Sequence, residues 1–383
     1  MRRLGSVDTC VRCSLTTNNI NLDEFFIVTH IITAHAPTEN VVIECLLQDG
    51  YWDRTEIIRL ADGSRRVRKQ GKGNDSAGPW GADNLRQEAL YLLNLETDVA
   101  DLFPQLLAYW DNHHGVGYEM SFLEQRIDVA QLARQGLFNQ SQADTFQKYL
   151  GTRVFSQLQR PTNTQKPLSH NITGTLRSAC QWMTEHPDFV ALVESPELVI
   201  NDQFVAGLEY NLSRLGKSEV LQALDKQPQV RLHGDLHLEN MLLPAKGCNP
   251  EWPTQVTLID PVSVASVQVG HPLFDLGKYE SYATGELPAM RQRKVSVMGF
   301  DSSSELGCYS FELHWQDPEL APFRRINWHS TMRNCYESQY GSVDQAVYEL
   351  LQAYYAAAMV LCTKGVERQA RALKLVLSLH LSF

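Results

Sequence analysis

Short apolar and β-branched runs, separated by polar turns, organise the first part of the chain after a polar start. Residues 1–24 are polar and predict a loose tail. The runs that follow lie at residues 26–28, 41–43, 55–60, 65–69, 106–110 and 116–120. Asp62-Gly63 joins two of them and is typical of a β-hairpin turn, whereas apolar positions within 84–95 recur at helical spacing. Residues 25–123 therefore predict a small, mostly antiparallel sheet with one helix.

The pattern changes to helical periodicity in the rest of the chain. Apolar positions recur at helical spacing within residues 128–134, 141–159, 176–185 and 203–214. A long apolar stripe at 343–381 predicts two helices broken near Gly365. Strand-like runs occur at residues 230–243, 256–259, 294–298 and 309–315. The pattern predicts an α+β protein with a flexible tail at 1–24, a sheet-rich lobe at 25–123 and a mainly helical lobe at 124–383.

Composition narrows the class of protein. The chain has 383 residues, of which 43% are hydrophobic and 20% charged, so it can bury a sizeable core. Its net charge of −10 argues against a nucleic-acid partner. The longest apolar run, at 354–362, is too short to span a membrane, and no apolar segment follows the basic start. We therefore expect a cytoplasmic protein with neither a membrane nor a nucleic-acid partner.

The cysteines indicate no metal site. The chain has 8 cysteines, and only Cys10 and Cys13 form a Cys-x-x-Cys pair. A zinc ribbon needs a second pair, and a redox pair should lie between a strand and a helix. We interpret this pair as incidental, and the scattered thiols as typical of a reducing compartment.

The segment that carries chemistry lies at residues 231–243. Asp235 and Asn240 are five residues apart on one loop between apolar strands. This spacing is typical of phosphoryl transfer, in which the Asp accepts a proton from the attacking hydroxyl and the Asn binds a metal ion. Asp260 ends a later apolar strand and offers a second oxygen ligand, which suits Mg²⁺.

Three motifs in order resemble one family. His-Gly-Asp-Leu-His-Leu-Glu-Asn at 233–240, Ile-Asp-Pro at 259–261 and Gly-His-Pro-Leu-Phe-Asp-Leu-Gly at 270–277 resemble the aminoglycoside phosphotransferase-type kinases, which share the protein-kinase fold. The resemblance implies a bilobal fold with ATP and Mg²⁺ between the lobes. It makes Asp235 the catalytic base, Asn240 and Asp260 the metal ligands, and His233 a catalytic-loop residue that, together with Asp275, braces the loop.

The same resemblance assigns roles in the first lobe. Kinase-like proteins need a Lys on a strand for the nucleotide phosphates and a Glu on the next helix to hold it. Lys69 ends the second strand of the predicted hairpin, and Glu88 lies in the predicted helix. Residues 118–124, with Met120 and Phe122, resemble the hinge that contacts adenine. The turn at 49–54 takes the place of the phosphate-covering loop but contains a single glycine.

The acceptor is predicted less sharply. Pro261 restricts the backbone after Asp260 and argues against a mobile activation segment, which favours a small-molecule hydroxyl over a protein as acceptor. The resemblance implies that helices of 141–215 and the C-terminal helices line the acceptor pocket. Acidic residues such as Glu280 and Glu337 are then candidate contacts for a cationic acceptor, as in an aminoglycoside-like antibiotic or an amino sugar.

Other functions remain open at this point. The chain can be a protein Ser/Thr kinase, or a non-catalytic nucleotide-binding protein of kinase shape, although the complete set of site residues argues against the second. A third hypothesis is a metal-dependent hydrolase in which His233, Asp235 and His237 hold the metal.

Overall fold

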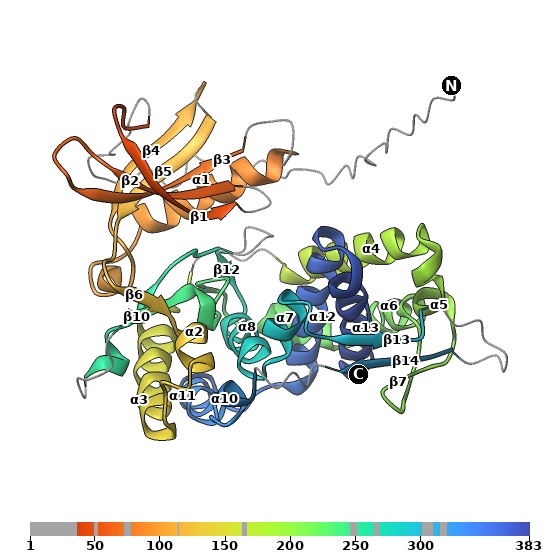
Figure 1. The fold of residues 1–383 in the computed structure, drawn as a ribbon. Helices are drawn as coiled ribbons and strands as arrows, with labels where there is room; N and C mark the ends of the chain where they lie inside the picture. The colour runs from red at the N-terminus through yellow and green to blue at the C-terminus, as the bar shows by residue number, and fades with distance from the viewer. Residues whose placement is uncertain are drawn as a thin grey trace, which may run out of the picture.

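The structure, a computed structural model, describes residues 37–49, 53–72, 78–113, 115–162, 167–245, 251–262, 268–300, 309–314 and 320–383. The expected tail at 1–24, the Cys10/Cys13 pair, the run at 26–28 and residues 50–52 of the predicted phosphate-covering turn lie outside these residues. Figure 1 shows two lobes, a sheet with one long helix and a larger, mainly helical part. The α+β fold of two lobes that the sequence predicts is confirmed.

The first lobe is a five-stranded antiparallel sheet. Its strands run in the order β1 (Val42–Asp49), β2 (Asp53–Arg59), β3 (Arg65–Gly71), β5 (Gly115–Ser121) and β4 (Leu106–Asn112). The β2–β3 hairpin turns at Gly63, whose φ of 85° suits glycine, and Asp62 accepts hydrogen bonds from Ser64. Helix α1 (Gly78–Leu93) packs on β3, β4 and β5. The short 3₁₀ helix η2 (Ala100–Leu102) lies between α1 and β4.

The second lobe is built mainly from helices. They are α2 (Val129–Arg134), α3 (Gln140–Gly151), the π-helix η3 (Thr152–Leu158), α4 (Leu168–Thr184), η4 (Pro187–Phe189), α5 (Val190–Glu194), α6 (Leu208–Leu215), α7 (Val220–Lys226), η5 (Leu238–Asn240), η6 (Trp252–Thr254), α8 (Leu273–Ala283), α9 (Glu286–Arg291), α10 (Ala321–Arg324), α11 (Ser330–Tyr340), α12 (Gln345–Cys362) and α13 (Gly365–Leu381). The predicted pair of C-terminal helices is confirmed, and Gly365 begins the second with a φ of 58°. Among the described helices, none is both long and apolar enough to cross a membrane.

Three small sheets complete this lobe. They comprise β11 (Thr257–Leu258), β10 (Met241–Pro244) and β6 (Arg126–Asp128); β12 (Val269–Gly270) with β9 (Val230–Arg231); and β13 (Ser296–Met298), β14 (Tyr309–His314), β7 (Leu198–Ile200) and β8 (Gln203–Val205). The helix predicted over 203–214 is wrong at its start, because residues 203–205 pair with β7 and the helix begins only at Leu208.

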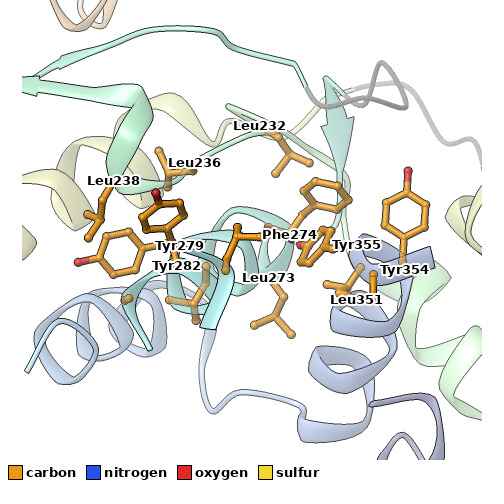
Figure 2. Packing of buried hydrophobic residues seen from close by; sticks show 14 of the residues in the cluster. Leu232, Leu236, Leu238, Leu273, Phe274, Tyr279, Tyr282, Leu351, Tyr354 and Tyr355 are labelled. Carbon is orange, nitrogen blue, oxygen red and sulfur yellow. Dashed lines mark hydrogen bonds between the residues drawn. The ribbon is translucent and has the colours of Figure 1, made fainter. Parts of the chain in front are cut away.

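The apolar core reaches directly under the segment at 231–243. Figure 2 shows leucines of that segment beside aromatic side chains of α8 and α12. Leu232, Leu236 and Leu238 are fully buried there. These three leucines anchor the segment that carries His233, Asp235 and His237 in the core.

Candidate active site

A buried lysine joins the two lobes. Lys69 on β3 is 5% exposed, and its Nζ donates to Glu88 Oε2 of α1 at 2.7 Å. The same Nζ lies 3.1 Å from Asp260 Oδ1 in the second lobe and 3.3 Å from Asp53 Oδ2 of β2. Tyr118 on β5 donates its hydroxyl to the same oxygen, Glu88 Oε2, at 2.8 Å, which adds a second donor to this carboxylate. The structure thus brings together Lys69, Glu88 and Asp260, as the sequence predicts.

Charge in this cluster is unevenly balanced. Burial opposes the charged form of Lys69, but Asp260 and Glu88 outweigh it and hold the pKa of the ammonium well above its usual value. Burial raises the pKa of Glu88, and Lys69 only partly offsets this. Three carboxylates therefore share one ammonium group where the lobes meet. A protonated lysine held in this way can bind nucleotide phosphates.

The predicted base is held by three donors. Asp235 Oδ1 lies 2.8 Å from Lys278 Nζ, and Oδ2 lies 3.3 Å from His237 Nε2. Asn240 Nδ2 donates to Asp235 Oδ2 at 3.1 Å and to the Asp235 carbonyl at 3.0 Å. Burial opposes ionisation, but Lys278 and His237 outweigh it and hold the pKa of Asp235 well below its usual range. Asp235 is therefore ionised at neutral pH and can accept a hydrogen bond from a hydroxyl.

A second carboxylate organises the backbone of this loop. Asp275 of α8 is fully buried and accepts the N–H groups of His233 at 3.0 Å and Gly234 at 2.9 Å. Gln159 Nε2 also donates to it at 3.0 Å. Gly234 has a φ of 84°, a left-handed conformation that favours glycine. These contacts place Asp275 where a bracing residue was expected, and they set the direction in which Asp235 leaves the loop.

The side chain of His233 points away from solvent, into the interior under the loop. It is fully buried, its ring stacks on Phe103, and its Nδ1 accepts the Asp235 N–H at 3.3 Å. Burial lowers its pKa to about 4, so the ring is neutral at physiological pH. Its position suits support of the loop rather than contact with a substrate.

Asn240 comes directly before β10, and Asp260 lies shortly after β11, the strand that pairs with β10. Met241 of β10 pairs with Leu258 of β11, and Ile259 donates its N–H to the Asn240 carbonyl at 2.9 Å. The Asn240 amide group donates toward Asp235, which turns its oxygen the other way. Asp260 keeps 30% of its side chain exposed.

This donor set fits Mg²⁺, which takes one or two protein oxygens and completes its shell with phosphate oxygens and water. By contrast, within the residues that the structure describes, no three His, Cys, Asp or Glu side chains group into a metal site.

The predicted adenine contacts lie at the end of β5. Met120 is buried and pairs with Val67 on β3 and Leu106 on β4, so it belongs to the interior of the sheet. Phe122 follows β5, is partly buried, and has the Arg65 guanidinium 5.6 Å from its ring centroid. Their contact with a nucleotide stays a prediction.

Sequence reasoning missed Lys278 as a partner of Asp235 and Arg291 as a partner of His237. Arg291 Nη1 lies 3.5 Å from His237 Nε2 and 2.7 Å from Glu239 Oε2. The Asp-Leu-Gly-Lys sequence at 275–278 was the available signal, because a residue three positions after Asp275 lies on the same side of a helix.

The two candidate contacts for a cationic acceptor, Glu280 and Glu337, differ in burial and pairing. Glu280 is buried and paired with Arg333, whose Nε lies 2.8 Å from Oε1. A carboxylate compensated in this way offers little attraction to a second cation. Glu337 is half-buried on α11.

Comparison with known proteins gives no match to a protein-family model and no match among curated proteins. Among solved structures, a protein named as a fructosamine-3-kinase from Thermobifida fusca is similar, with 17% identity, a TM-score of 0.48, and coverage of 89% of this chain and 93% of that chain. An aminoglycoside 2′-phosphotransferase-IIIa, solved with GDP, has 16% identity, a TM-score of 0.48, and coverage of 89% and 94%. A choline kinase from Cryptosporidium parvum has 11% identity, a TM-score of 0.42, and coverage of 88% of each chain. Because these identities and TM-scores are low, the function of this chain has to be argued from its own residues.

Proposed function

We propose that the chain is an ATP-dependent phosphotransferase that moves the γ-phosphate to a hydroxyl group of a small molecule. The carrying observation is the 3.1 Å contact between Lys69 and Asp260, which joins the phosphate-binding and catalytic residues of two lobes at one point. Glu88, Asp235 and Asn240 complete this set of polar residues from both lobes. The folding of either lobe by itself does not require the set.

The residues divide the reaction between them. Lys69, held by Glu88, binds the α- and β-phosphates. Asp235 accepts a hydrogen bond from the acceptor hydroxyl and takes its proton as the oxygen bonds to the γ-phosphorus. The bond to the β–γ bridging oxygen breaks, and ADP leaves with that electron pair. Asn240 fixes the Asp235 carboxylate through the 3.1 Å hydrogen bond. Positioning of this kind suffices because the transition state of phosphoryl transfer is loose.

Asn240 and Asp260 would hold Mg²⁺. The ion, when bound, neutralises charge on the phosphate oxygens. Asp260 has a φ of 51°, and the Val262 N–H donates to the His233 carbonyl at 2.6 Å. These two features turn residues 260–262 back onto the catalytic loop, which supports a small-molecule acceptor. We place the protein in the cytoplasm, with no membrane or nucleic-acid partner.

The test follows labelled phosphate. The protein is incubated with ATP labelled at the γ-position and a cell extract that has been split into small-molecule and protein fractions. We expect label in the small-molecule fraction, and an Asp235→Asn variant should reduce it by orders of magnitude while binding nucleotide normally. Label in a polypeptide would favour the protein-kinase alternative. Equal transfer by Asp235→Asn and the parent would contradict the role of Asp235.

A further inference from the structure

A lysine without an assigned role lies against the proposed base. Lys278 is on α8, and its Nζ is 2.8 Å from Asp235 Oδ1. Its side chain is 14% exposed, so the ammonium group is largely withdrawn from solvent. Its Nζ also lies 5.4 Å from the centre of the Tyr355 ring on α12, within cation–π range.

The position of Lys278 is set by rigid packing. Gln352 of α12 donates to the Gly277 carbonyl at 2.8 Å, and Tyr355 donates to the Phe274 carbonyl at 2.6 Å. Figure 2 shows Phe274 and Tyr355 side by side in the apolar cluster, and their ring centroids are 5.0 Å apart. Asp275 on the same helix holds the loop backbone. Lys278 is therefore preorganised relative to Asp235, and needs no reorganisation to act there.

We propose that Lys278 is a catalytic residue that donates a hydrogen bond to an oxygen of the γ-phosphoryl group during its transfer. This inference rests on the proposed function. A hydroxyl oxygen bound to Asp235 attacks the γ-phosphorus, so the oxygens of that group come within about 5 Å of the carboxylate. An ammonium group in direct contact with Asp235 lies within reach of them.

The assignment divides the phosphate charge between two lysines. Lys69 approaches from the first lobe and Lys278 from the second. Arg291 is less suited, because its contacts are with Glu239 at 2.7 Å and His237 Nε2 at 3.5 Å, whereas Lys278 contacts Asp235 itself. In the step itself, the acceptor oxygen bonds to phosphorus as its proton passes to Asp235, and ADP leaves with the bridging electron pair. Lys278 stays protonated throughout and only stabilises charge on the moving group.

The simpler alternative is that Lys278 merely holds Asp235 in place. The two roles separate in a binding experiment that needs no acceptor. Aluminium fluoride mimics the transferring phosphoryl group when it binds beside ADP, so the affinity of ADP with Mg²⁺ is measured by calorimetry with and without it. If Lys278 acts only on Asp235, its loss leaves the increase in ADP affinity caused by aluminium fluoride unchanged. If Lys278 contacts the phosphoryl group, its loss reduces that increase.

Three variants make the test sharp. In Lys278→Met we expect ADP binding to change by less than about twofold and the gain from aluminium fluoride to fall at least about tenfold, the cost of one charge-assisted hydrogen bond. Lys278→Arg should recover part of that gain. Lys374→Met is the matched control, because Lys374 forms a 3.2 Å ion pair with Glu286 and should leave both affinities unchanged. If Lys278→Met fails to fold, as thermal unfolding will show, Lys278→Gln replaces it.

The outcomes distinguish the two proposals. A Lys278→Met protein that gains as much from fluoride as the parent overturns the role of Lys278 and leaves the phosphotransferase intact. A parent that binds ADP but gains nothing from fluoride overturns the role of Lys278 as well. A parent that does not bind ADP with Mg²⁺ at all refutes the proposed function itself.

Discussion

Two neighbouring residues of β3 provide a matched test of nucleotide binding. Lys69 and Arg68 are both buried, but they lie on opposite faces of the strand. Arg68 pairs with Glu119 at 2.8 Å on one face, while Lys69 meets Glu88 and Asp260 on the other. Lys69→Met and Arg68→Met each remove one buried cation from the same strand. A difference in nucleotide affinity between them therefore comes from the face of the sheet on which each residue lies, and not from damage to the sheet.

The structure sets the size of the expected effect. A charge-assisted hydrogen bond contributes about 1.5–3 kcal/mol, which corresponds to about 10- to 150-fold in affinity. Lys69→Met also leaves Asp53, Glu88 and Asp260 facing the phosphates without the ammonium that lies within 3.3 Å of all three. Their repulsion adds to the loss. We therefore expect ADP to bind at least about tenfold more weakly to Lys69→Met, and within about twofold of the parent to Arg68→Met.

Stability must be measured alongside affinity. Lys69→Met leaves the buried Glu88 carboxylate without its cation, which costs about 3–5 kcal/mol when nothing else compensates. In Arg68→Met the Glu119 carboxylate keeps a second cation, Arg66, at 3.0 Å. The raised pKa of Glu88, caused by burial, lets this carboxylate take a proton and limits the cost in Lys69→Met. Urea unfolding gives the free energy of unfolding, and calorimetry with ADP and Mg²⁺ gives the affinity. Equal loss of affinity in both variants would refute the reasoning, because it would trace the effect to a weakened sheet. Unchanged affinity in Lys69→Met would refute it directly.

Three further predictions concern the metal, the packing and the pH response. Asp260→Ala should weaken ADP binding in the presence of Mg²⁺ but not in its absence, which calorimetry under both conditions measures. An equal loss of affinity with and without Mg²⁺ would contradict the metal role of Asp260. Gly117→Ala should lower the free energy of unfolding by about 2 kcal/mol or more, because a Cβ there would lie 2.4 Å from Trp110 Cζ2 and 2.8 Å from the Lys69 carbonyl. Gly174→Ala on α4, where a Cβ meets nothing within 4 Å, should instead raise it by about 0.5–1 kcal/mol, and a similar loss in both variants would contradict the steric argument. Burial lowers the pKa of His271 to about 4, below its usual 6.5, so the unfolded chain binds more protons between these values and stability falls by up to about 3 kcal/mol on acidification through that window. His271→Gln should make this fall shallower in urea unfolding, and an unchanged slope would count against the assignment.

The loop at 233–240 and the hairpin were recognisable in the sequence because their signals are local. Asp235 and Asn240 lie five residues apart on one loop, and the hairpin turn carries Asp62-Gly63. In the hairpin the residue types state the backbone conformation directly. The chemistry that the spacing of Asp235 and Asn240 suggests stays a prediction. The two C-terminal helices follow from a break at Gly365 in a long apolar stripe.

The missed features depend on pairings between distant parts of the chain. Residues 203–205 were expected to be helical, but β8 forms there because β7 is available as a partner. Glu280 looks like a free acid in the sequence until Arg333 of α11 neutralises it. Lys278 looks like a solvent-exposed helical charge until α8 is packed against the loop. A single sequence gives the helix face of each residue, whereas the partner across the fold is fixed only by tertiary packing.

Helix α8 makes two separate contacts with the loop at 233–240. Asp275 in its first turn binds the backbone N–H groups of His233 and Gly234, and Lys278 one turn later pairs with the Asp235 carboxylate. Residues three positions apart are neighbours on a helix surface, so both contacts move together if α8 moves. The backbone direction of the loop and the charge of its acid are therefore set by the same rigid element. This coupling explains why a motif 40 residues beyond the loop accompanies it in the sequence: without α8, Asp235 would lose both its orientation and its compensating charge.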